Sequence, residues 1–411
     1  MTINLKNFIL PTRAVKTFFN VEKTNVCAII PTYKPGMFTV TLVEDLIRWN
    51  PRIAVYVVDD STPRDNQETF RIFEKITLAS NRVTLLRTPS NALKAGALNY
   101  ALKYIFEGRK AYMPDVILTL DDDVVISPTT VQNLVAELMS GTNLGAVCSQ
   151  CAVLNKNKNI LTRLQGLEYL GFNATRLADE GFYGGPLVMH GMLTAFRAHA
   201  LFGVGGFAEK HLIEDYEITA RLKTQGWGVK AAINSYAWTI VPERFSELWR
   251  QRTRWSYGGL TVIAKAKRAA PVLQDLLGHG VFFSTILMVD LLILLTLFGN
   301  GGFTHPQLAY WIIGLSFLQV AVWYVFQLWL MRFYREKDIY DWVIRASLIP
   351  EFVYSNMLTL VVVGSYLFFI FTTLTHTVTQ RSGSALQGLV TRCRRMFLLI
   401  GYTDGWGTRV N

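Results

Sequence analysis

Three adjacent carboxylates, Asp121-Asp122-Asp123, are the residues whose types and spacing point most directly to chemistry. Largely apolar segments precede and follow the triplet, at 118–120 and 124–126. Carboxylates this close repel one another unless a cation lies near them. Mg²⁺ and Mn²⁺ accept one or two carboxylates and leave their other positions to phosphate oxygens and water. The triplet therefore predicts a divalent metal site, with a solvated turn at a strand end as the alternative.

Two further residues suit a nucleotide. Lys94 lies just before a predicted helix that begins near Ala95, and a lysine beside a helix N-terminus suits a phosphate group. Asp60 ends a buried strand and could accept a hydrogen bond from uracil or ribose. The alternatives are an ordinary surface lysine and a carboxylate that only caps a helix.

The pair Glu214-Asp215 is the best candidate for a general base. It follows an apolar residue and opens a predicted helix, whose N-terminus would keep Asp215 ionised and able to accept a proton. One carboxylate suffices for direct displacement with inversion, whereas retention through a covalent intermediate needs a second carboxylate as nucleophile. A capping acid is the alternative for this pair.

Hydrogen-bond donors and a large aromatic ring lie close together in Gln251-Arg252-Thr253-Arg254-Trp255. The planar guanidinium of arginine suits a diphosphate, and the face of tryptophan can support a pyranose ring. Residues 244–272 also form an amphipathic stretch suited to a membrane surface, so the segment could serve either purpose or both.

Short apolar strands alternate with helices as far as residue 120. This pattern predicts an α/β, Rossmann-like domain with a mainly parallel sheet, less regular after residue 145. In such sheets ligands bind beyond the carboxyl ends of the strands. Polar residues follow three of the predicted strands. Thr32 comes shortly after the strand at 26–30, Asp60 after the strand at 53–58, and the carboxylate triplet directly after the strand at 116–120. We therefore expect these residues to converge.

From Val281 onward the chain becomes strongly apolar, with candidate membrane spans at 281–298, 308–331 and 357–374. Residues 1–25 contain no signal-peptide core, and basic residues follow the second candidate span, so we expect a cytoplasmic catalytic part on a multi-pass cell-membrane protein. Three crossings would put the basic tail outside, against the positive-inside rule. An even number of crossings is therefore expected.

Composition favours a membrane over nucleic acid as the partner of the basic residues. The net charge is +11, but the basic residues cluster beside the apolar segments and no nucleic-acid-binding motif accompanies them. Cys148 and Cys151 lie in a predicted apolar strand with no second cysteine or histidine pair nearby. They are interpreted as reduced core residues.

The ordered motifs resemble family 2 glycosyltransferases of the GT-A fold. The resemblance is closest to the membrane-embedded processive synthases of hyaluronan, chitin, cellulose and poly-N-acetylglucosamine. It covers about residues 25–260, and Q-x-x-R-W is its most specific part. It implies donor binding by Thr32, Asp60, Lys94, Asp121 and Asp122, a Mg²⁺ or Mn²⁺ ion on Asp123 and Asp121, catalysis by Asp215 with Glu214, and contacts to the diphosphate and acceptor from Gln251, Arg252, Arg254 and Trp255.

The resemblance also implies a UDP-sugar donor and a growing β-linked polysaccharide as acceptor and product. A single sugar transferred to a lipid, as in glucosylceramide synthases, is the alternative; a non-catalytic scaffold and a transporter fit the motifs less well. A homo-oligomer or an accessory subunit could complete a translocation pore. The expected layout is an N-terminal segment (1–25), a GT-A domain (26–243), amphipathic interface helices (244–275), a transmembrane region (276–375) and a basic tail (376–411).

Overall fold

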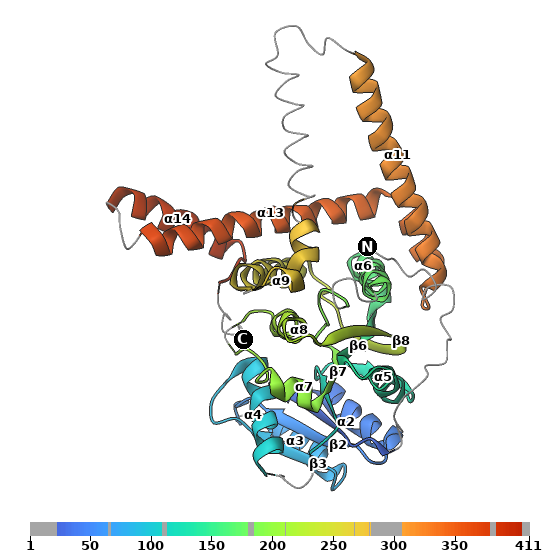
Figure 1. The fold of residues 1–411 in the computed structure, drawn as a ribbon, viewed down its shortest axis with the longest axis vertical. Helices are drawn as coiled ribbons and strands as arrows, with labels where there is room; N and C mark the ends of the chain where they lie inside the picture. Colours follow the sequence, from blue (N-terminus) through green and yellow to red (C-terminus); the bar gives the residue numbers. More distant parts are fainter. Residues whose placement is uncertain are drawn as a thin grey trace.

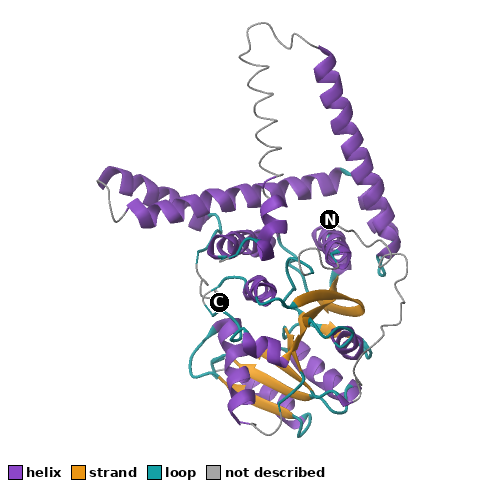
Figure 2. Ribbon diagram, viewed as in Figure 1, coloured by secondary structure: helices purple, strands orange, loops and turns teal. Residues whose placement is uncertain are grey.

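The fold is described from a computed structural model. The structure describes residues 23–64, 67–108, 113–179, 185–209, 211–266, 268–278, 280, 306–378 and 384–404. An eight-stranded sheet with the order β3-β2-β1-β4-β7-β6-β8-β5 forms the centre of the catalytic part. Helices cover both of its faces (Figures 1 and 2).

The first four strands form the regular half of the sheet. They pair in parallel and are joined by helices, as the alternating pattern predicts. The buried side chains on the two faces of these strands belong to two large hydrophobic cores, one on each side of the sheet. The elements are β1 (Val26–Thr32), α2 (Met37–Trp49), β2 (Ala54–Asp59), α3 (Gln67–Leu78), β3 (Val83–Arg87), α4 (Leu93–Gly108) and β4 (Val116–Leu120).

The second half makes the sheet mixed, in the part of the chain where the sequence pattern is less regular, while most pairings in the whole sheet remain parallel. β7 pairs antiparallel with both β4 and β6, and β5 pairs antiparallel with β8, whereas β6 and β8 are parallel. A parallel neighbour requires a long crossover connection, and the regular strand–helix alternation that provides it ends after β4. The elements are β5 (Val125–Ile126), α5 (Thr130–Leu138), β6 (Leu144–Val153), α6 (Ile160–Ala178), β7 (Leu193–Arg197), α7 (Ala198–Gly203), α8 (Glu214–Thr224) and β8 (Gly228–Thr239).

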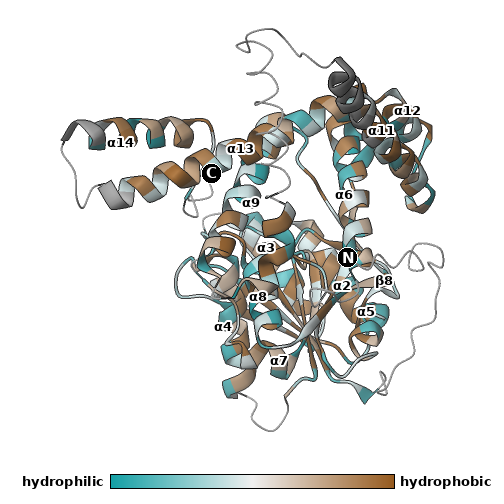
Figure 3. Cartoon of the chain, turned by 45° about the horizontal axis from the view of Figure 1, so that its top comes forward, coloured by the Kyte–Doolittle hydropathy of each residue, from teal (hydrophilic) through white to brown (hydrophobic). Residues whose placement is uncertain are grey.

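Helices follow the sheet to the end of the described chain. They are α9 (Phe245–Lys265), α11 (Pro306–Leu330), α12 (Ile339–Ser347), α13 (Ile349–Val378) and α14 (Ser384–Leu399), with single 3₁₀ turns at 156–158, 270–272 and 331–333. α11 projects away from the catalytic part, whereas α13 and α14 run across its top beside α9 (Figure 1). Apolar residues dominate α13 (Figure 3).

The structure gives partial support to a membrane region. Among the described residues, one helical segment, Ile349–Thr375 in α13, is both long enough and apolar enough to cross a bilayer. α11 covers the second predicted span, of which Val320–Phe333 forms a shorter apolar segment. The first predicted span, 281–298, lies outside the described residues, as do residues 1–22 and 405–411. A region of several spans is therefore not confirmed.

Contacts at both ends of α13 hold it against the catalytic part. Near its start, the Tyr354 hydroxyl donates to Glu168 Oε2 on α6 at 2.7 Å. Near its end, Thr372 Oγ1 lies 3.3 Å from the Tyr257 hydroxyl on α9, and the ring centroids of Tyr257 and Phe368 are 4.9 Å apart. α13 therefore lies along the catalytic part over most of its length.

Candidate active site

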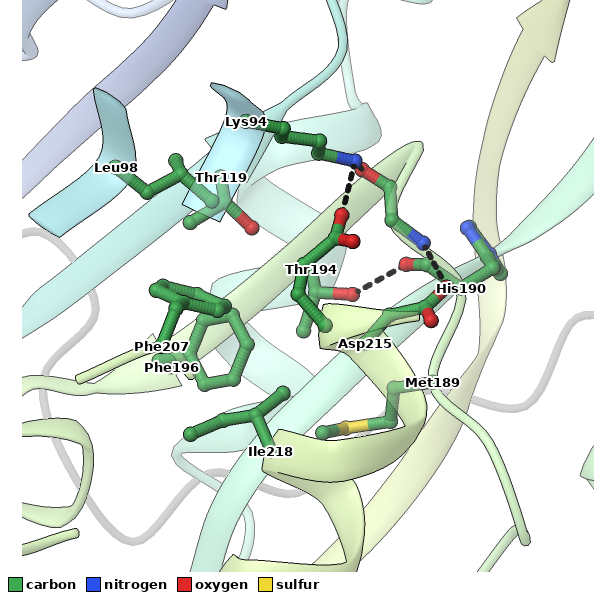
Figure 4. Close-up of a pocket in the computed structure, with 12 residues that line it drawn as sticks. Lys94, Leu98, Thr119, Met189, His190, Thr194, Phe196, Phe207, Asp215 and Ile218 are labelled. Atoms are coloured by element: carbon green, nitrogen blue, oxygen red, sulfur yellow. Dashed lines mark hydrogen bonds and ion pairs between the residues drawn. The ribbon is translucent and has the colours of Figure 1, made fainter. Parts of the chain in front are cut away.

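Lys94 connects three of the predicted motifs. Its Nζ lies 2.5 Å from Asp121 Oδ1, at the end of β4, and 3.1 Å from Glu214 Oε1, at the start of α8. Burial on its own would lower the pKa of Lys94, but the charges of Asp121 and Glu214 outweigh burial and raise it. Figure 4 shows Lys94 reaching from α4 toward the loop at His190 and toward Asp215. The lysine is therefore held as a cation at the carboxyl edge of the sheet.

Asp215 is partly buried and is oriented by two backbone amides. The N–H of Gly191 donates to its Oδ2 at 3.1 Å, and the N–H of Tyr216 donates to its Oδ1 at 2.8 Å. Burial, and then the charge of Glu214, raises the pKa of Asp215 to about 7, although Lys94 opposes this shift. A carboxylate with a pKa near the working pH is well suited to accept a proton from a hydroxyl group.

Gly191 is a site residue that the motif analysis did not predict. A Cβ built on it would lie inside van der Waals contact with Lys94 Nζ and 3.7 Å from Asp215 Oδ2. Its amide binds Asp215, and its carbonyl oxygen accepts from Lys94 Nζ at 3.4 Å. Both functions belong to the backbone, so the sequence carries no side-chain signal for them.

The carboxylate triplet faces different partners. Asp121 pairs with Lys94, Asp122 Oδ2 accepts from Thr32 Oγ1 at 2.5 Å, and Asp123 Oδ2 accepts from Thr239 Oγ1 at 3.1 Å. Burial, and then the charges of Asp121 and Asp122, raises the pKa of Asp123 to about 6. A cation bound beside Asp123 would stabilise the ionised form of this carboxyl group against burial and against repulsion from its neighbours.

The donor set fits a hard divalent cation that is only partly held by protein. Within the described residues, no three histidine, cysteine, aspartate or glutamate side chains gather around one point. The triplet nevertheless offers carboxylate oxygens, which Mg²⁺ and Mn²⁺ prefer, and these ions take their other ligands from phosphate and water. Asp121 and Asp123 are the residues that would hold the ion.

Asp60 fixes the loop that leads to Lys94. Its Oδ1 accepts from the Ala92 N–H at 2.7 Å and from Thr88 Oγ1 at 3.0 Å. Ser61 and Leu93, which flank these contacts, have φ values of 55° and 61°. Non-glycine residues in this region are strained and are often found at functional sites. Asp60 thus has the structural role considered as its alternative, and these contacts leave its predicted role toward a nucleotide untested.

Contacts between α9 and the start of α8 hold the helix that carries the Q-x-x-R-W segment close to the helix that carries Asp215. A Cβ on Gly258 would overlap the side chain of Ile213 and lie 3.3 Å from Leu212 Cβ, so the glycine lets α9 approach the start of α8 closely. Gln251, Arg254 and Trp255 lie on this same helix. The structure therefore packs the helix that carries the Q-x-x-R-W segment against the start of the helix that carries Glu214 and Asp215.

Arg252 is placed differently from its neighbours. Its guanidinium binds Glu168 through two nitrogens, at 3.2 and 2.5 Å, and lies 4.1 Å from the centroid of the Trp255 ring. Glu168 also accepts from Tyr354 on α13. Burial opposes the charge of Glu168, which nevertheless raises the pKa of Arg252. Arg252 thus fastens α9 to α6 and α13, and its predicted contact with a diphosphate has no support in this arrangement.

Comparison with known families identifies the chain. The profile described as glycosyl transferase family group 2 matches residues 116–375, which is more than half of the chain, and that of glycosyl transferase family 2 matches residues 27–201. The chain belongs to glycosyl transferase family group 2. It is therefore a sugar-transferring enzyme, as the motifs predict.

Curated relatives and a solved structure agree with this assignment. The poly-beta-1,6-N-acetyl-D-glucosamine synthase of Staphylococcus aureus (strain COL) is 24% identical over 219 residues, which are 53% of this chain and 50% of the relative. That of Staphylococcus epidermidis is 26% identical over 215 residues, 52% and 49% of the two chains. This family 2 transferase thus spans about half the length of the curated relatives it matches.

The solved structure is a mannosyltransferase from Pyrobaculum calidifontis in complex with GDP-Man and Mn²⁺. It superposes with a TM-score of 0.52 and 18% identity, over 80% of this chain and 94% of that chain. The shared architecture is the GT-A fold with a mixed, Rossmann-like sheet and helices after it. At this identity, the likeness establishes the fold of the transferase alone.

Proposed function

We propose that this family 2 transferase is an inverting, metal-dependent enzyme that moves a sugar from a UDP-sugar to a growing β-linked polysaccharide at a membrane. The observation that supports this best is the junction of Lys94 with Asp121 and Glu214, directly beside Asp215. It joins a cation for the diphosphate, the metal-binding carboxylates and a proton acceptor in one place. The synthase relatives support the polysaccharide product.

Asp215 is the base in the proposed reaction. Its carboxylate accepts the proton of an acceptor hydroxyl, whose oxygen forms a bond to the anomeric carbon on the face opposite the nucleotide. The bond from that carbon to the diphosphate oxygen breaks, and its electron pair leaves with UDP. Inversion follows because a single displacement occurs. The Gly191 and Tyr216 amides hold the Asp215 carboxylate in position for the proton transfer.

The leaving diphosphate is stabilised by positive charge. Lys94 supplies a fixed cation, and a divalent ion bound by Asp121 and Asp123 would neutralise the charge that develops on the diphosphate oxygens. Thr32, Asp60 and Asp122 line the carboxyl ends of β1, β2 and β4 and are the proposed contacts to the rest of the donor. Mn²⁺ in the mannosyltransferase of the same fold supports a divalent cation here.

The acceptor is proposed to lie along α9. Trp255 offers its ring to the acceptor sugar, with Gln251 and Arg254 as hydrogen-bond donors near the diphosphate. Arg252 acts as a positioning residue, because its contacts with Glu168 and with the Trp255 ring hold the helix and the tryptophan in place.

A membrane location is proposed from the apolar C-terminal helices. Trp249 on α9 donates to the carbonyl oxygen of Ile400, just after α14, at 2.8 Å. This contact supports the proposal that the region after α14 lies on the same side of the membrane as α9, with an even number of crossings between them. We propose that α13 lies along the cytoplasmic membrane surface, with the catalytic part beneath it.

The test is a transfer assay on the full chain in nanodiscs. A panel of UDP-sugars led by UDP-N-acetylglucosamine, with GDP-mannose included, is supplied with Mn²⁺, Mg²⁺ or a chelator. Asp215→Asn is compared with Glu44→Gln, which changes an exposed carboxylate on α2. High-molecular-weight product from one donor, lost with the chelator and with Asp215→Asn alone, would support the proposal. A small lipid-soluble product would instead identify an enzyme that adds a single sugar to a lipid, and equal activity in Asp215→Asn would refute the role of Asp215.

A further inference from the structure

A second cavity lies away from the active site, between the sheet, α6 and the turn that follows α11. Its volume is about 660 Å³, within the range of about 300–1,000 Å³ typical of small-molecule sites. Strands β6 and β8 form one wall, and residues 332–336 form the wall opposite them. Neither the family assignment nor the proposed chemistry uses this space.

The cavity is lined by aromatic rings and side-chain amides. Tyr236 and Trp238 alternate along β8, with ring centroids 6.2 Å apart and an angle of 32° between the rings. Asn133, Gln150 and Asn234 add amide groups to the lining. Sugar rings present apolar C–H faces and many hydroxyl groups, so this mixture of flat rings and paired donors and acceptors matches a carbohydrate. The side-chain nitrogens of Asn133 and Gln150 donate to backbone carbonyl oxygens of β8, so these amides are held in fixed orientations in the cavity wall.

A buried hydroxyl in the lining adds a second indication. Tyr334 is 9% exposed, and within the described residues its hydroxyl has no hydrogen-bond partner. Buried polar groups without partners are rare in native proteins, and a ligand or an ordered water is a usual explanation. The Arg335 guanidinium also lines the cavity, and its carbon lies over the Tyr236 ring, 4.6 Å from the centroid.

The cavity and the Asp123 site lie on opposite faces of β8. Thr239 donates to Asp123, and successive side chains of a strand point to opposite faces, so Tyr236 and Trp238 point away from the Asp123 side of β8. At this edge the sheet ends with β5, which has two residues and separates the Asp123 face from the cavity face. Ser127, directly after β5, lines the cavity. A glycan bound near Asp123 could therefore reach the cavity around the end of β5.

We infer that this cavity is a second binding site for carbohydrate, and that its ligand is a short stretch of the neutral β-linked glycan that the enzyme extends. This inference rests on the proposed function for the identity of the glycan. The charged side chains that line the cavity are Arg332, Arg335 and Glu336, and Glu336 already accepts from the Trp238 indole. Two arginines and one glutamate supply too little net positive charge to bind a nucleoside diphosphate, which requires several cations or a metal ion. The site would retain product between additions.

The experiment measures binding of short β-linked N-acetylglucosamine and glucose oligosaccharides to the full chain in detergent, without donor, by titration calorimetry. We expect two classes of oligosaccharide site, one at the active site and a second at the cavity. Tyr236→Ala removes one ring of the cavity and should weaken oligosaccharide binding at this second class about three- to tenfold, the amount that one aromatic contact contributes. Ala152→Phe fills the cavity from its wall and should abolish that class. Tyr100→Ala, which removes a surface tyrosine on α4, is the matched control and should bind as the unmodified chain does.

UDP affinity and thermal unfolding are measured on each variant to show that the fold and the active site persist. Two classes of oligosaccharide site in the unmodified chain, one of which disappears in Ala152→Phe with UDP affinity unchanged, support the inference. The same result without transfer from any sugar nucleotide keeps the carbohydrate site and refutes the proposed function. A single class of sites in all variants of an active enzyme, or a cavity that binds inorganic phosphate and no oligosaccharide, overturns the inference.

Discussion

At the scale of single residues, the site depends on opposite charges held at short range in a buried space. Lys94 stays charged because Asp121 and Glu214 face it, whereas burial, and then the charge of Glu214, raises the pKa of Asp215 to about 7. A change in any of these side chains therefore alters the protonation of the others. Double-mutant cycles are the appropriate way to separate their contributions.

The pKa of about 7 for Asp215 predicts the pH dependence of transfer. A raised carboxyl pKa means that the group is protonated below pH 7 and unable to accept the acceptor proton there. We expect kcat/KM to fall about tenfold per pH unit below that point and to level off above it. Initial rates at subsaturating donor across this range, with UDP affinity measured in parallel, check the prediction. A rate independent of pH between 5 and 7 would exclude Asp215 as the base.

Replacement of Gly191 should damage catalysis more than folding. In Gly191→Ala the new methyl group meets the Lys94 ammonium, which is the mobile end of a long side chain, so the lysine moves and loses its position between Asp121 and Glu214. We expect transfer to fall on the order of a hundredfold, because small displacements of catalytic groups have effects of that size.

Gly171→Ala is the control for Gly191→Ala. A Cβ at Gly171, on α6, has no neighbour within 4 Å among the described residues. Alanine should therefore leave transfer unchanged and stabilise the helix by up to about 1 kcal/mol. Comparable loss of activity in both variants, or a large drop in the melting temperature of Gly191→Ala alone, would argue against a role specific to the site.

Residue identity predicted much of this site but not all of it. Asp121 was expected at the carboxyl edge of the sheet because it follows a strand, and the family resemblance implied Lys94, Glu214 and Asp215 as site residues. The structure brings these four residues together. The amide of Gly191 could not be predicted, because every residue except proline offers such a group. The Arg252 partner could not be predicted either, since Glu168 lies 84 positions earlier in the chain.

At the scale of elements, α9 carries out two functions with neighbouring residues. Gln251, Arg254 and Trp255 are proposed to contact substrate, whereas Arg252 between them binds Glu168 on α6. The period of a helix allows this, because successive residues point about 100° apart. The sequence predicted the helix from its amphipathic pattern, but not which arginine would face protein.

Loss of Arg252 should destabilise the docking of α9. Arg252→Ala leaves the Glu168 carboxylate buried without its cation, and removal of one partner of a buried ion pair costs about 3–5 kcal/mol. Chemical denaturation of the full chain in detergent measures the change. Arg250→Ala, an exposed arginine on the same helix, should change stability by no more than about 0.5 kcal/mol. Equal stability of the two variants would show that the buried pair contributes nothing net.

The strand–helix pattern also shows where prediction of the sheet ended. Up to β4, each strand is followed by a helix, and the parallel order was predicted correctly. β5 has two residues and no helix crossover of its own, and β7 follows a long helix and a loop. Strand direction in that region depends on contacts between distant segments, which local periodicity does not contain.

At the scale of the whole molecule, the C-terminal helices return to the catalytic part. Tyr402, after α14, packs against Trp249 on α9 and Phe368 on α13. A helix that crossed a bilayer and ended on its far side could not bring the following segment back to α9. α13 therefore combines a segment that is long and apolar enough to cross a bilayer with side chains that contact α9 and the residues after α14.

Cys393 on α14 offers a direct test of this topology. It is partly exposed, whereas Cys27, Cys148 and Cys151 are buried. A membrane-impermeant maleimide should label the protein in inside-out membrane vesicles and not in intact cells, because α14 lies on the side of the catalytic part. Cys393→Ser should abolish the labelling. Labelling of intact cells would place α14 outside and contradict the contact between Trp249 and Ile400.

The contact between α9 and α13 also has a consequence for how the protein is made. Tyr257 and Phe368 lie 4.9 Å apart by ring centroids, yet the ribosome adds them more than a hundred residues apart. Domains generally fold in order during synthesis, so the sheet can form while the upper face of α9 is still bare. In the nascent chain, that apolar face of α9 stays exposed until α13 has been synthesised and packs against it. Packing of α9 is therefore completed only after α13 has been synthesised.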